Sequence, residues 1–153
     1  MEKLYKDYYQ SPIGLIEISG TEKAIVSVRF SEERRAESSC PLIKTCIEQL
    51  DEYFKGKRTK FNLPLSLAGT PFQNKVWHAL AEIPFGKTRN YKEIATAIQQ
   101  EKACRAVGSA NRRNPVCLLI PCHRVIGKDG SLIGYSGGLW RKEWLLKHES
   151  GNL

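Results

Sequence analysis

Residues 90–114 read NYKEIATAIQQEKACRAVGSANRRN, and the organisation of the second half of the chain follows from this stretch. Asn90, followed three residues later by Glu93, forms a capping-box pattern that predicts a short helix over residues 91–98. A polar turn then leads into a second short helix, about residues 102–111. Two short helices joined by a tight turn indicate a helix-turn-helix, although many helical hairpins share this outline and bind nothing.

The second of these helices has an unusual surface. Its small residues are Ala103, Cys104, Ala106, Gly108, Ser109 and Ala110. Lys102 and Arg105 lie near its N-terminus, where cations oppose the helix dipole, and Gly108 lowers its helix propensity. These features suit a helix that approaches a polyanion closely. The minor groove of DNA, for example, is only ~6 Å wide, so a helix with small side chains would enter it more easily. Packing against a neighbouring helix would require the same small face.

Positive charge is concentrated in the same region. The chain carries 24 Lys and Arg residues against 16 Asp and Glu residues, a net charge of +8. Within residues 86–114 the carboxylates are Glu93 and Glu101, and the cations are Lys87, Arg89, Lys92, Lys102, Arg105, Arg112 and Arg113. Such a patch attracts a polyanion because each neutralised phosphate releases condensed counterions. A solvated basic face that serves solubility is the alternative.

The first third of the chain reads as strands followed by a helix. Turn signals separate three β-rich runs and favour a small antiparallel sheet; the runs are Leu4–Tyr9, Leu15–Ser19 and Ala24–Phe30. From Pro41 onward, apolar residues recur at a spacing of three and four, which predicts an amphipathic helix that ends at Gly56. This part carries no chemical motif, and we interpret it as a scaffold.

A polar stretch interrupted by proline, residues 57–68, marks a predicted boundary between two domains, 1–68 and 69–153. Beyond it, Thr70-Pro71 begins a helix, with threonine as the cap and proline in the first turn. We therefore expect an α+β fold. It combines a small antiparallel-sheet N-terminal domain with a mainly helical C-terminal domain that contains the helix-turn-helix.

Length and composition limit the class of protein. A chain of 153 residues with 41% apolar residues is long and apolar enough to fold around a core. No apolar run is long enough to span a bilayer, and the N-terminus shows no signal-peptide core, so we expect a cytoplasmic protein without membrane contact. Five cysteines are an odd number, unlike a secreted disulfide framework, and no Cys-x2-Cys pair supports a zinc site.

Directly after the predicted helix-turn-helix, residues 114–127 read NPVCLLIPCHRVIG. Cys122 and His123 follow an apolar run and lie between Pro121 and Arg124. A thiol becomes a good nucleophile when a neighbouring base or positive charge favours the thiolate, and His123 and Arg124 are the available groups. On spacing alone, such a cysteine is more often a buried core residue than a catalyst.

This segment and its flanking motifs closely resemble the O6-alkylguanine-DNA alkyltransferases, which are methylated-DNA-protein-cysteine methyltransferases. The motifs are Asn114-Pro115, Pro121-Cys122-His123-Arg124-Val125, Gly134-Tyr135-Ser136-Gly137-Gly138, Lys142-Glu143-Trp144-Leu145-Leu146 and His148-Glu149. The resemblance is strong from Thr70 to Glu149 and weak in sequence over residues 1–69. It implies a single-turnover repair enzyme that irreversibly moves the alkyl group of O6-alkylguanine in DNA onto its own Cys122. O4-alkylthymine is a further candidate substrate.

The resemblance also implies a role for each matching catalytic residue. Cys122 matches the alkyl acceptor, His123 the base that acts on it through a bound water, and Glu149 the carboxylate that holds and polarises the histidine. Asn114 matches the residue that hydrogen-bonds the main chain around the reactive turn, and Tyr91 the hydroxyl that approaches guanine N3. Without the resemblance, Glu149 would read as a solvated carboxylate at a helix end, Asn114 as a helix C-cap and Tyr91 as a packing residue.

A second set of residues matches positions that contact substrate or DNA. Arg105 matches the finger that enters the base stack, and Val125 a backbone acceptor for the guanine amino group. The others are Tyr135 and Ser136, in the loop that covers the pocket, and Lys92 and Lys128, at phosphate or groove contacts. Because an O6-alkyl carbon lies within a stacked duplex, the nucleotide must be flipped into a pocket. We expect a monomer that binds double-stranded DNA containing O6-alkylguanine through the minor groove and needs no cofactor or metal.

Three other functions are weighed against this one. An alkyltransferase-like lesion sensor would flip damaged guanine and recruit other factors, but the presence of Cys122 argues against it. A helix-turn-helix transcription regulator could use Cys122 to sense alkylation, yet no additional sensor or activation domain is evident. A thiol hydrolase would turn over a soluble ester or amide and would not need the basic helix pair.

Overall fold

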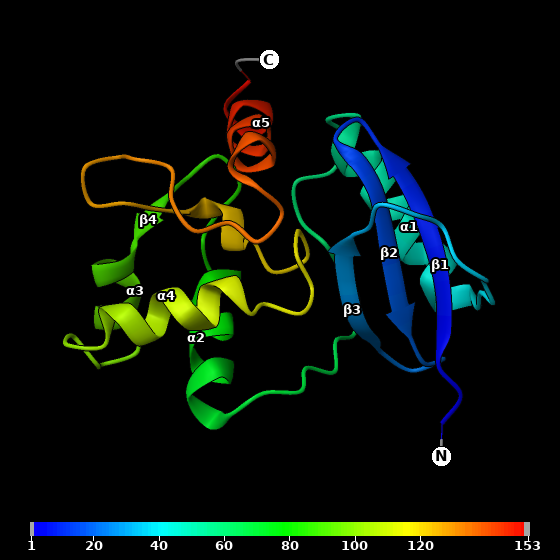
Figure 1. The fold of residues 1–153 in the computed structure, drawn as a ribbon, viewed down its shortest axis with the longest axis horizontal. Coiled ribbons are helices and arrows are strands. Elements are labelled where there is room, and N and C mark those ends of the chain that lie inside the picture. Colours follow the sequence, from blue (N-terminus) through cyan, green and yellow to red (C-terminus); the bar gives the residue numbers. More distant parts are fainter. Residues whose placement is uncertain (1, 152–153) are drawn as a thin grey trace. The chain divides into compact units, whose positions relative to one another are not determined.

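The structure is a computed structural model that describes residues 2–151 and divides into two units, Met1–Ala68 and Gly69–Leu153 (Figure 1). The first unit holds a three-stranded antiparallel sheet in the order β1-β2-β3. Its strands are β1 (Tyr5–Ser11), β2 (Gly14–Gly20) and β3 (Ile25–Phe30). Together with the helices of the second unit, this sheet confirms the predicted α+β class.

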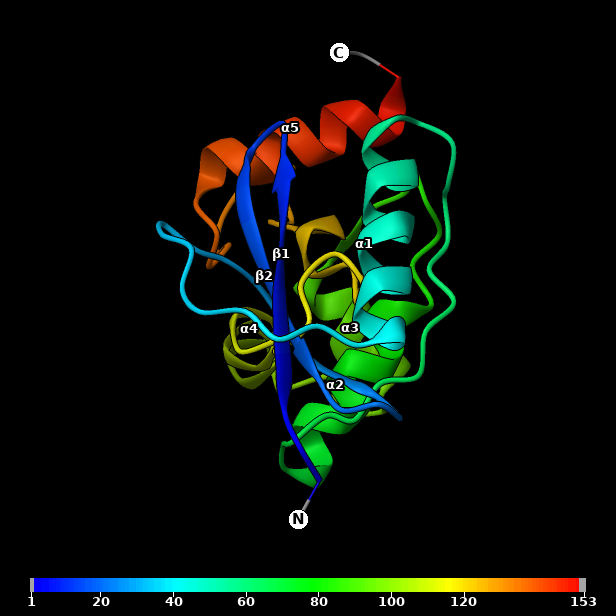
Figure 2. The same ribbon diagram turned by 90° about the vertical axis from the view of Figure 1, so that its right-hand side faces the viewer.

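Helix α1 (Pro41–Phe54) lies along one face of this sheet (Figure 2). Its apolar positions at a spacing of three and four, Ile43, Cys46 and Leu50, are fully buried, as are Ile16 and Ile18 of β2. Burial of such side chains contributes roughly 1.5–3 kcal/mol each. The unit therefore has a hydrophobic core of its own.

The second unit begins with three helices, α2 (Pro71–Ala81), α3 (Tyr91–Ala97) and α4 (Cys104–Arg112). Thr70 caps α2 and Asn90 caps α3, each in a complete capping box, which satisfies backbone N–H groups at both helix starts. A short turn joins α3 to α4, as the sequence predicts. Helix α4, however, begins at Cys104 instead of near Lys102, because Ala103 takes a non-helical conformation at the N-cap (φ −97°, ψ 26°).

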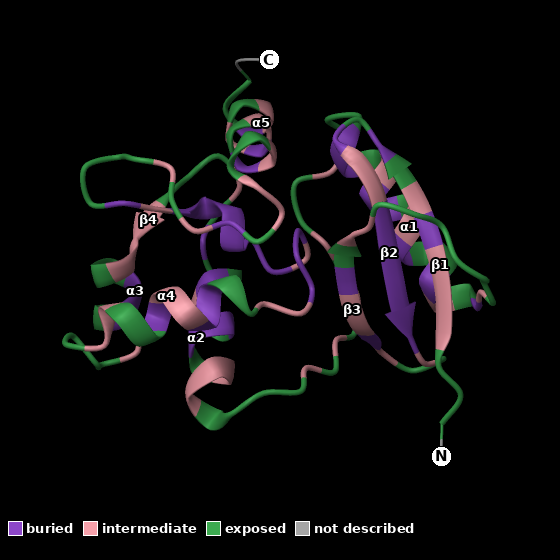
Figure 3. Cartoon of the chain, in the orientation of Figure 1, coloured by how far each residue is buried: buried purple, intermediate pink, exposed green. Residues whose placement is uncertain are grey.

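Helix α2 packs against helix α4. The indole Nε1 of Trp77 donates to the carbonyl of Ala110 at 2.9 Å. Val107 and Ala110 are buried, whereas Arg105 and Ala106 are exposed, so the small residues of this helix divide between two faces (Figure 3). Internal packing thus accounts for part of the small-residue pattern, and the rest of it lies on the surface.

The remaining elements surround a short 3-10 turn, η1 (Cys122–Arg124). Strand β5 (Val125–Ile126) follows η1 directly and pairs in parallel with strand β4 (Arg89–Asn90). Helix α5 (Leu139–Ser150) packs on η1. The sequence does not predict these two short strands. Among the described residues, no helix has the length and apolar character needed to cross a bilayer.

Candidate active site

Cys122, His123 and Glu149 meet in the interior of the second unit. Cys122 opens η1, and Glu149 comes from the last turn of α5. The Nε2 atom of His123 lies 2.7 Å from Oε2 of Glu149. The exposed fractions of Cys122, His123 and Glu149 are 2%, 0% and 6%. Glu149 is therefore a buried partner of the histidine, and the alternative reading as a solvated carboxylate at a helix end is wrong.

Arg124 donates two hydrogen bonds to the carboxylate of Glu149. Its Nε donates to Oε1 at 2.7 Å and its Nη2 to Oε2 at 3.0 Å, while Nη1 donates to the carbonyl of Ile83 at 2.7 Å. The forked geometry of a guanidinium suits this two-point contact. Sequence reasoning offered Arg124 as a charge that favours the thiolate, but the structure places its guanidinium on Glu149. Arg124 acts on the site through that carboxylate.

The charges fix the tautomer of the histidine. Burial would raise the pKa of Glu149, but its hydrogen bonds to His123 and Arg124 and the positive charge of Arg124 outweigh this effect and hold the pKa well below its usual range. Burial lowers the pKa of His123, against the opposing effect of Glu149. A neutral imidazole that donates Nε2–H to an ionised carboxylate has an unprotonated Nδ1. That Nδ1 atom is buried and has no hydrogen-bond partner among the described residues, so it can accept a proton.

The side chain of Cys122 rests as a thiol. Burial raises the pKa of Cys122, although the Asn114 side chain and the positive charge of Lys142 oppose the increase. Neighbouring groups therefore do not generate a standing thiolate, because desolvation of the charged form outweighs them. The site instead combines a protonated thiol with a neutral base, the arrangement that general-base activation requires.

Lys142 is a member of the site whose role the sequence does not reveal. Its side chain is fully buried, and its Nζ donates to the carbonyl of Ile133 at 2.6 Å. Burial lowers the pKa of this ammonium group to about 8, while the nearby Cys122 raises it. A lysine in the first turns of a helix usually extends into solvent, so nothing in its spacing predicts this position. Its positive charge favours the ionised form of Cys122.

Tyr91 faces the segment that leads to Tyr135. Its hydroxyl donates to the carbonyl of Ile133 at 3.4 Å, the same carbonyl that Lys142 contacts. A Cβ atom at Gly134, where φ is +67°, would lie 2.9 Å from the Tyr91 hydroxyl oxygen, so glycine permits both the conformation and the close approach. Burial raises the pKa of Tyr91, which keeps its hydroxyl protonated and available as a donor.

Asn114 holds the turn that leads to the thiol. Its Nδ2 donates to the carbonyl of Ile120 at 2.8 Å, and its Oδ1 accepts from the amide of Val116 at 3.0 Å. Between these two points Leu118 adopts a left-handed conformation with φ 72°, which costs a residue with a Cβ about 1–2 kcal/mol. The C-cap of α4 is Arg113, so the structure does not support Asn114 as a helix cap.

The other predicted contact residues lie at different depths. Val125 and Tyr135 are buried, whereas the exposed ones are Lys92, Arg105, Lys128 and Ser136. The structure therefore brings Cys122, His123 and Glu149 together and leaves four of the predicted DNA and substrate contacts on the surface. Their roles stay predictions.

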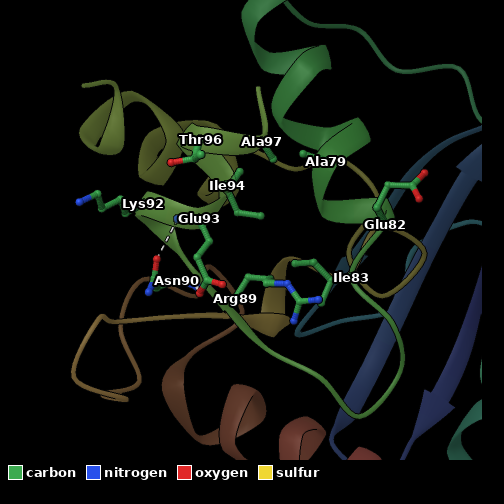
Figure 4. A pocket seen from close by; sticks show the side chains of 10 residues that line it. All are labelled: Ala79, Glu82, Ile83, Arg89, Asn90, Lys92, Glu93, Ile94, Thr96 and Ala97. Carbon is green, nitrogen blue, oxygen red and sulfur yellow. Dashed lines mark hydrogen bonds between the residues drawn. The ribbon is translucent and has the colours of Figure 1, made fainter. Parts of the chain in front are cut away.

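A separate pocket of about 600 Å³ opens between the end of α2 and helix α3 (Figure 4). Ile83 and Ile94 supply apolar walls, and Glu82, Arg89 and Glu93 add charge. Of the predicted site residues it includes Lys92 alone, whose side chain extends away from the other lining residues in this view. Cys122 is not part of its lining.

Comparison with protein families gives two matches that together cover nearly all of the described chain. Residues 71–151 match the DNA-binding domain of 6-O-methylguanine DNA methyltransferase, and residues 4–67 match the ribonuclease-like domain of the same family. A methylated-DNA–protein-cysteine methyltransferase of Methanosarcina barkeri is 48% identical over 157 residues, covering 98% of this chain and 99% of that protein. The constitutive protein of the same name from Bacillus subtilis is 43% identical over 144 residues, covering 86% and 87%.

Solved structures agree with these matches. The crystal structure of Mycobacterium tuberculosis O6-methylguanine methyltransferase superposes with a TM-score of 0.89 at 39% identity, covering 99% of this chain and 95% of that one. A structure of the M. tuberculosis protein in complex with DNA gives a TM-score of 0.87 at 42% identity, covering 95% and 92%.

Proposed function

Because the chain belongs to the 6-O-methylguanine DNA methyltransferase family, we propose that it repairs O6-alkylguanine in DNA by moving the alkyl group onto Cys122. It is a DNA-binding methyltransferase that acts by direct alkyl transfer. The observation that carries the assignment to Cys122 is the buried contact between His123 and Glu149, 2.7 Å long, beside this thiol. No other cysteine of the chain adjoins a histidine in sequence.

The reaction begins with the thiol proton. It passes through a water molecule to Nδ1 of His123, and the ionised Glu149 stabilises the imidazolium that forms. The Sγ atom then attacks the alkyl carbon, so that an S–C bond forms while the C–O6 bond breaks and its electron pair stays with the guanine. The Tyr91 hydroxyl donates to guanine N3 and stabilises this developing negative charge. The thioether product is stable, so each molecule reacts once.

Delivery of the base requires DNA distortion. Unstacking the damaged nucleotide costs a few kcal/mol, less where alkylation has weakened its pairing. We propose that α4 enters the minor groove with its exposed residues and that Arg105 fills the space left in the base stack. Lys92 and Lys128 are exposed cations suited to phosphate contacts. The protein acts as a monomer on double-stranded DNA.

Peptide mass mapping after incubation with an O6-methylguanine duplex is expected to show one methyl increment on the peptide that contains Cys122. The modified fraction should reach one per protein molecule and then stop, because no step regenerates the thiol. Repeated turnover, or methyl groups only on Cys104 or Cys117, would contradict the proposed function.

Arg105→Ala is expected to slow repair of duplex DNA by roughly 10- to 100-fold, the equivalent of 1.4–2.8 kcal/mol of lost flipping energy. Its reaction with free O6-benzylguanine should change little, because a free base needs no extrusion. Single-turnover rates with both substrates test this. Equal slowing of the two reactions would place Arg105 in the pocket or the fold and end its assignment as the finger.

A further inference from the structure

The turn that carries Cys122 is closed to solvent. Cys122 is 2% exposed, and every residue of the stretch 121–125 is buried. An alkyl carbon attached to a base can therefore reach Sγ of Cys122 only after part of the surrounding structure has moved. Segments with few buried contacts and no regular structure open at a lower free energy than packed helices.

The segment 133–138 borders this turn and contains no helix or strand. The Tyr91 hydroxyl and Nζ of Lys142 both donate to the carbonyl of Ile133, at 3.4 Å and 2.6 Å. Burial raises the pKa of Tyr91 and lowers that of Lys142, and the nearby Cys122 adds an increase in each case, so both side chains lie close to the thiol. The segment is therefore a neighbour of Cys122 that can move without breaking a helix or a sheet.

Glycines stand at both ends of residues 134–138, which we call the flap. Gly134 has a φ of +67° and Gly138 a φ of +96°, values that glycine adopts without steric cost. Hinges are formed by a few loop or element-terminal residues, often small, that absorb changes in φ and ψ. The flap thus has a permissive residue beside the held carbonyl of Ile133 and another at the start of α5.

Arg141 and Trp140 hold the second end of the flap. Nη1 of Arg141 donates to the carbonyl of Gly137 at 2.9 Å, and the guanidinium lies over the Trp140 ring, 4.6 Å from its centroid. A Cβ atom on Gly138 would lie 3.4 Å from Cδ1 of Trp140, so the same ring covers this hinge. These contacts form a latch between the first turn of α5 and the flap.

Resting on the proposed function, we propose that Arg141 and Trp140 latch the flap beside Cys122 and thereby limit the size of the alkyl group that the thiol accepts. A methyl group adds one carbon atom beyond O6, whereas a benzyl group adds a ring as well and needs a wider opening. The wider opening breaks the bond between Arg141 and Gly137, so the latch acts against bulky lesions more than against small ones. Both are positioning residues, because they hold the flap and do not contact the alkyl group.

Iodoacetamide modification of the DNA-free protein tests the latch without any repair reaction. The reagent modifies a cysteine only when it reaches the thiol, so its rate at Cys122 follows the open population of the flap. Arg141→Leu is expected to raise this rate by about 3- to 10-fold, the equivalent of one hydrogen bond. Cys117, buried in the same unit, should react at an unchanged rate. Acceleration of both cysteines alike would show a general loosening of the fold and overturn the inference.

Repair of two lesions in one duplex sequence, O6-methylguanine and O6-benzylguanine, tests the selectivity. The ratio of the benzyl rate to the methyl rate is expected to rise by about 3- to 10-fold in Arg141→Leu. Trp140→Leu should raise it by about 2- to 5-fold, the value of one cation–π contact, and Trp140→Phe, which keeps an aromatic face, should restore most of the wild-type ratio. Lys147→Leu is the matched control, because this cation of the same helix pairs with Glu143 at the surface and should leave the ratio unchanged.

An unchanged ratio in both Arg141→Leu and Trp140→Leu would overturn the inference, as would slowing of the two lesions by one factor, since the two residues would then only support α5. Trp140 is 57% exposed, so its replacement keeps the test available if Arg141→Leu does not fold. Absence of transfer from both lesions in the wild-type protein would instead refute the proposed function, while the iodoacetamide rates would still decide whether the latch exists.

Discussion

Cys122→Ser is expected to reduce alkyl transfer by at least about 10⁴-fold, the scale on which enzymes lose activity when their nucleophile is removed. A serine hydroxyl is far less acidic than a thiol, and the base at this site is a neutral histidine whose pKa is lowered by burial. His123 cannot therefore generate an alkoxide in useful amounts. Transfer of a labelled methyl group from duplex DNA to the protein measures the loss.

Cys122→Ser should still bind lesion-containing DNA, because we expect DNA binding to depend on exposed residues such as Arg105 and not on the buried Cys122. Cys104→Ser is the matched control: this thiol is half-buried in the first turn of α4, and its replacement should leave transfer intact. Transfer that persists in Cys122→Ser, or disappears in Cys104→Ser, would show that the acceptor has been misassigned.

Glu149→Leu is expected to lower the free energy of unfolding by about 3–5 kcal/mol, the usual result of leaving a buried charge without its partner. Arg124 would keep the Ile83 carbonyl and the Phe85 ring but lose its carboxylate partner, and Nε2 of His123 would lose its acceptor. Transfer should also slow by about 10²- to 10⁴-fold, the contribution typical of general-base catalysis. Urea unfolding measures the stability, and single-turnover kinetics the rate.

The control for this variant is Glu143→Gln on the same helix. Glu143 pairs with Lys147 at 3.0 Å, but both side chains are 54% exposed, so the loss should be at most about 1 kcal/mol. If Glu149→Leu were no more destabilising than Glu143→Gln, the buried contacts of Glu149 would contribute little to the fold.

The same carboxylate predicts sensitivity to acid. The folded-state pKa of Glu149 lies below its unfolded value, so its stabilising contribution is complete above about pH 4.3 and is lost as the pH falls below that value. His123, whose pKa is also lowered, adds instability in the same direction below about pH 6.5. Stability measured from pH 7 to pH 3 should fall less steeply in Glu149→Gln, which lacks the titrating group.

Local signals in the sequence were sufficient for most of the secondary structure. The capping patterns at Thr70 and Asn90 depend on residues three apart, and the structure contains both capping boxes. The apolar spacing after Pro41 likewise predicts α1, which ends at Phe54, two residues before Gly56. Such signals involve neighbours on one helix turn, so they can be read without knowledge of the tertiary fold.

The site depended on contacts that no local pattern contains. Glu149 is 26 residues from His123, and an isolated carboxylate near the end of a helix shows no sign that α5 will carry it into the interior. The burial of Lys142 is equally invisible, because it arises from the packing of segments that are distant in sequence. Residue types and motif order therefore identified the family and predicted the nucleophile. The tertiary structure decided the state of the thiol, because burial and distant charges, which set the pKa of an ionisable group, exist only once the chain has folded.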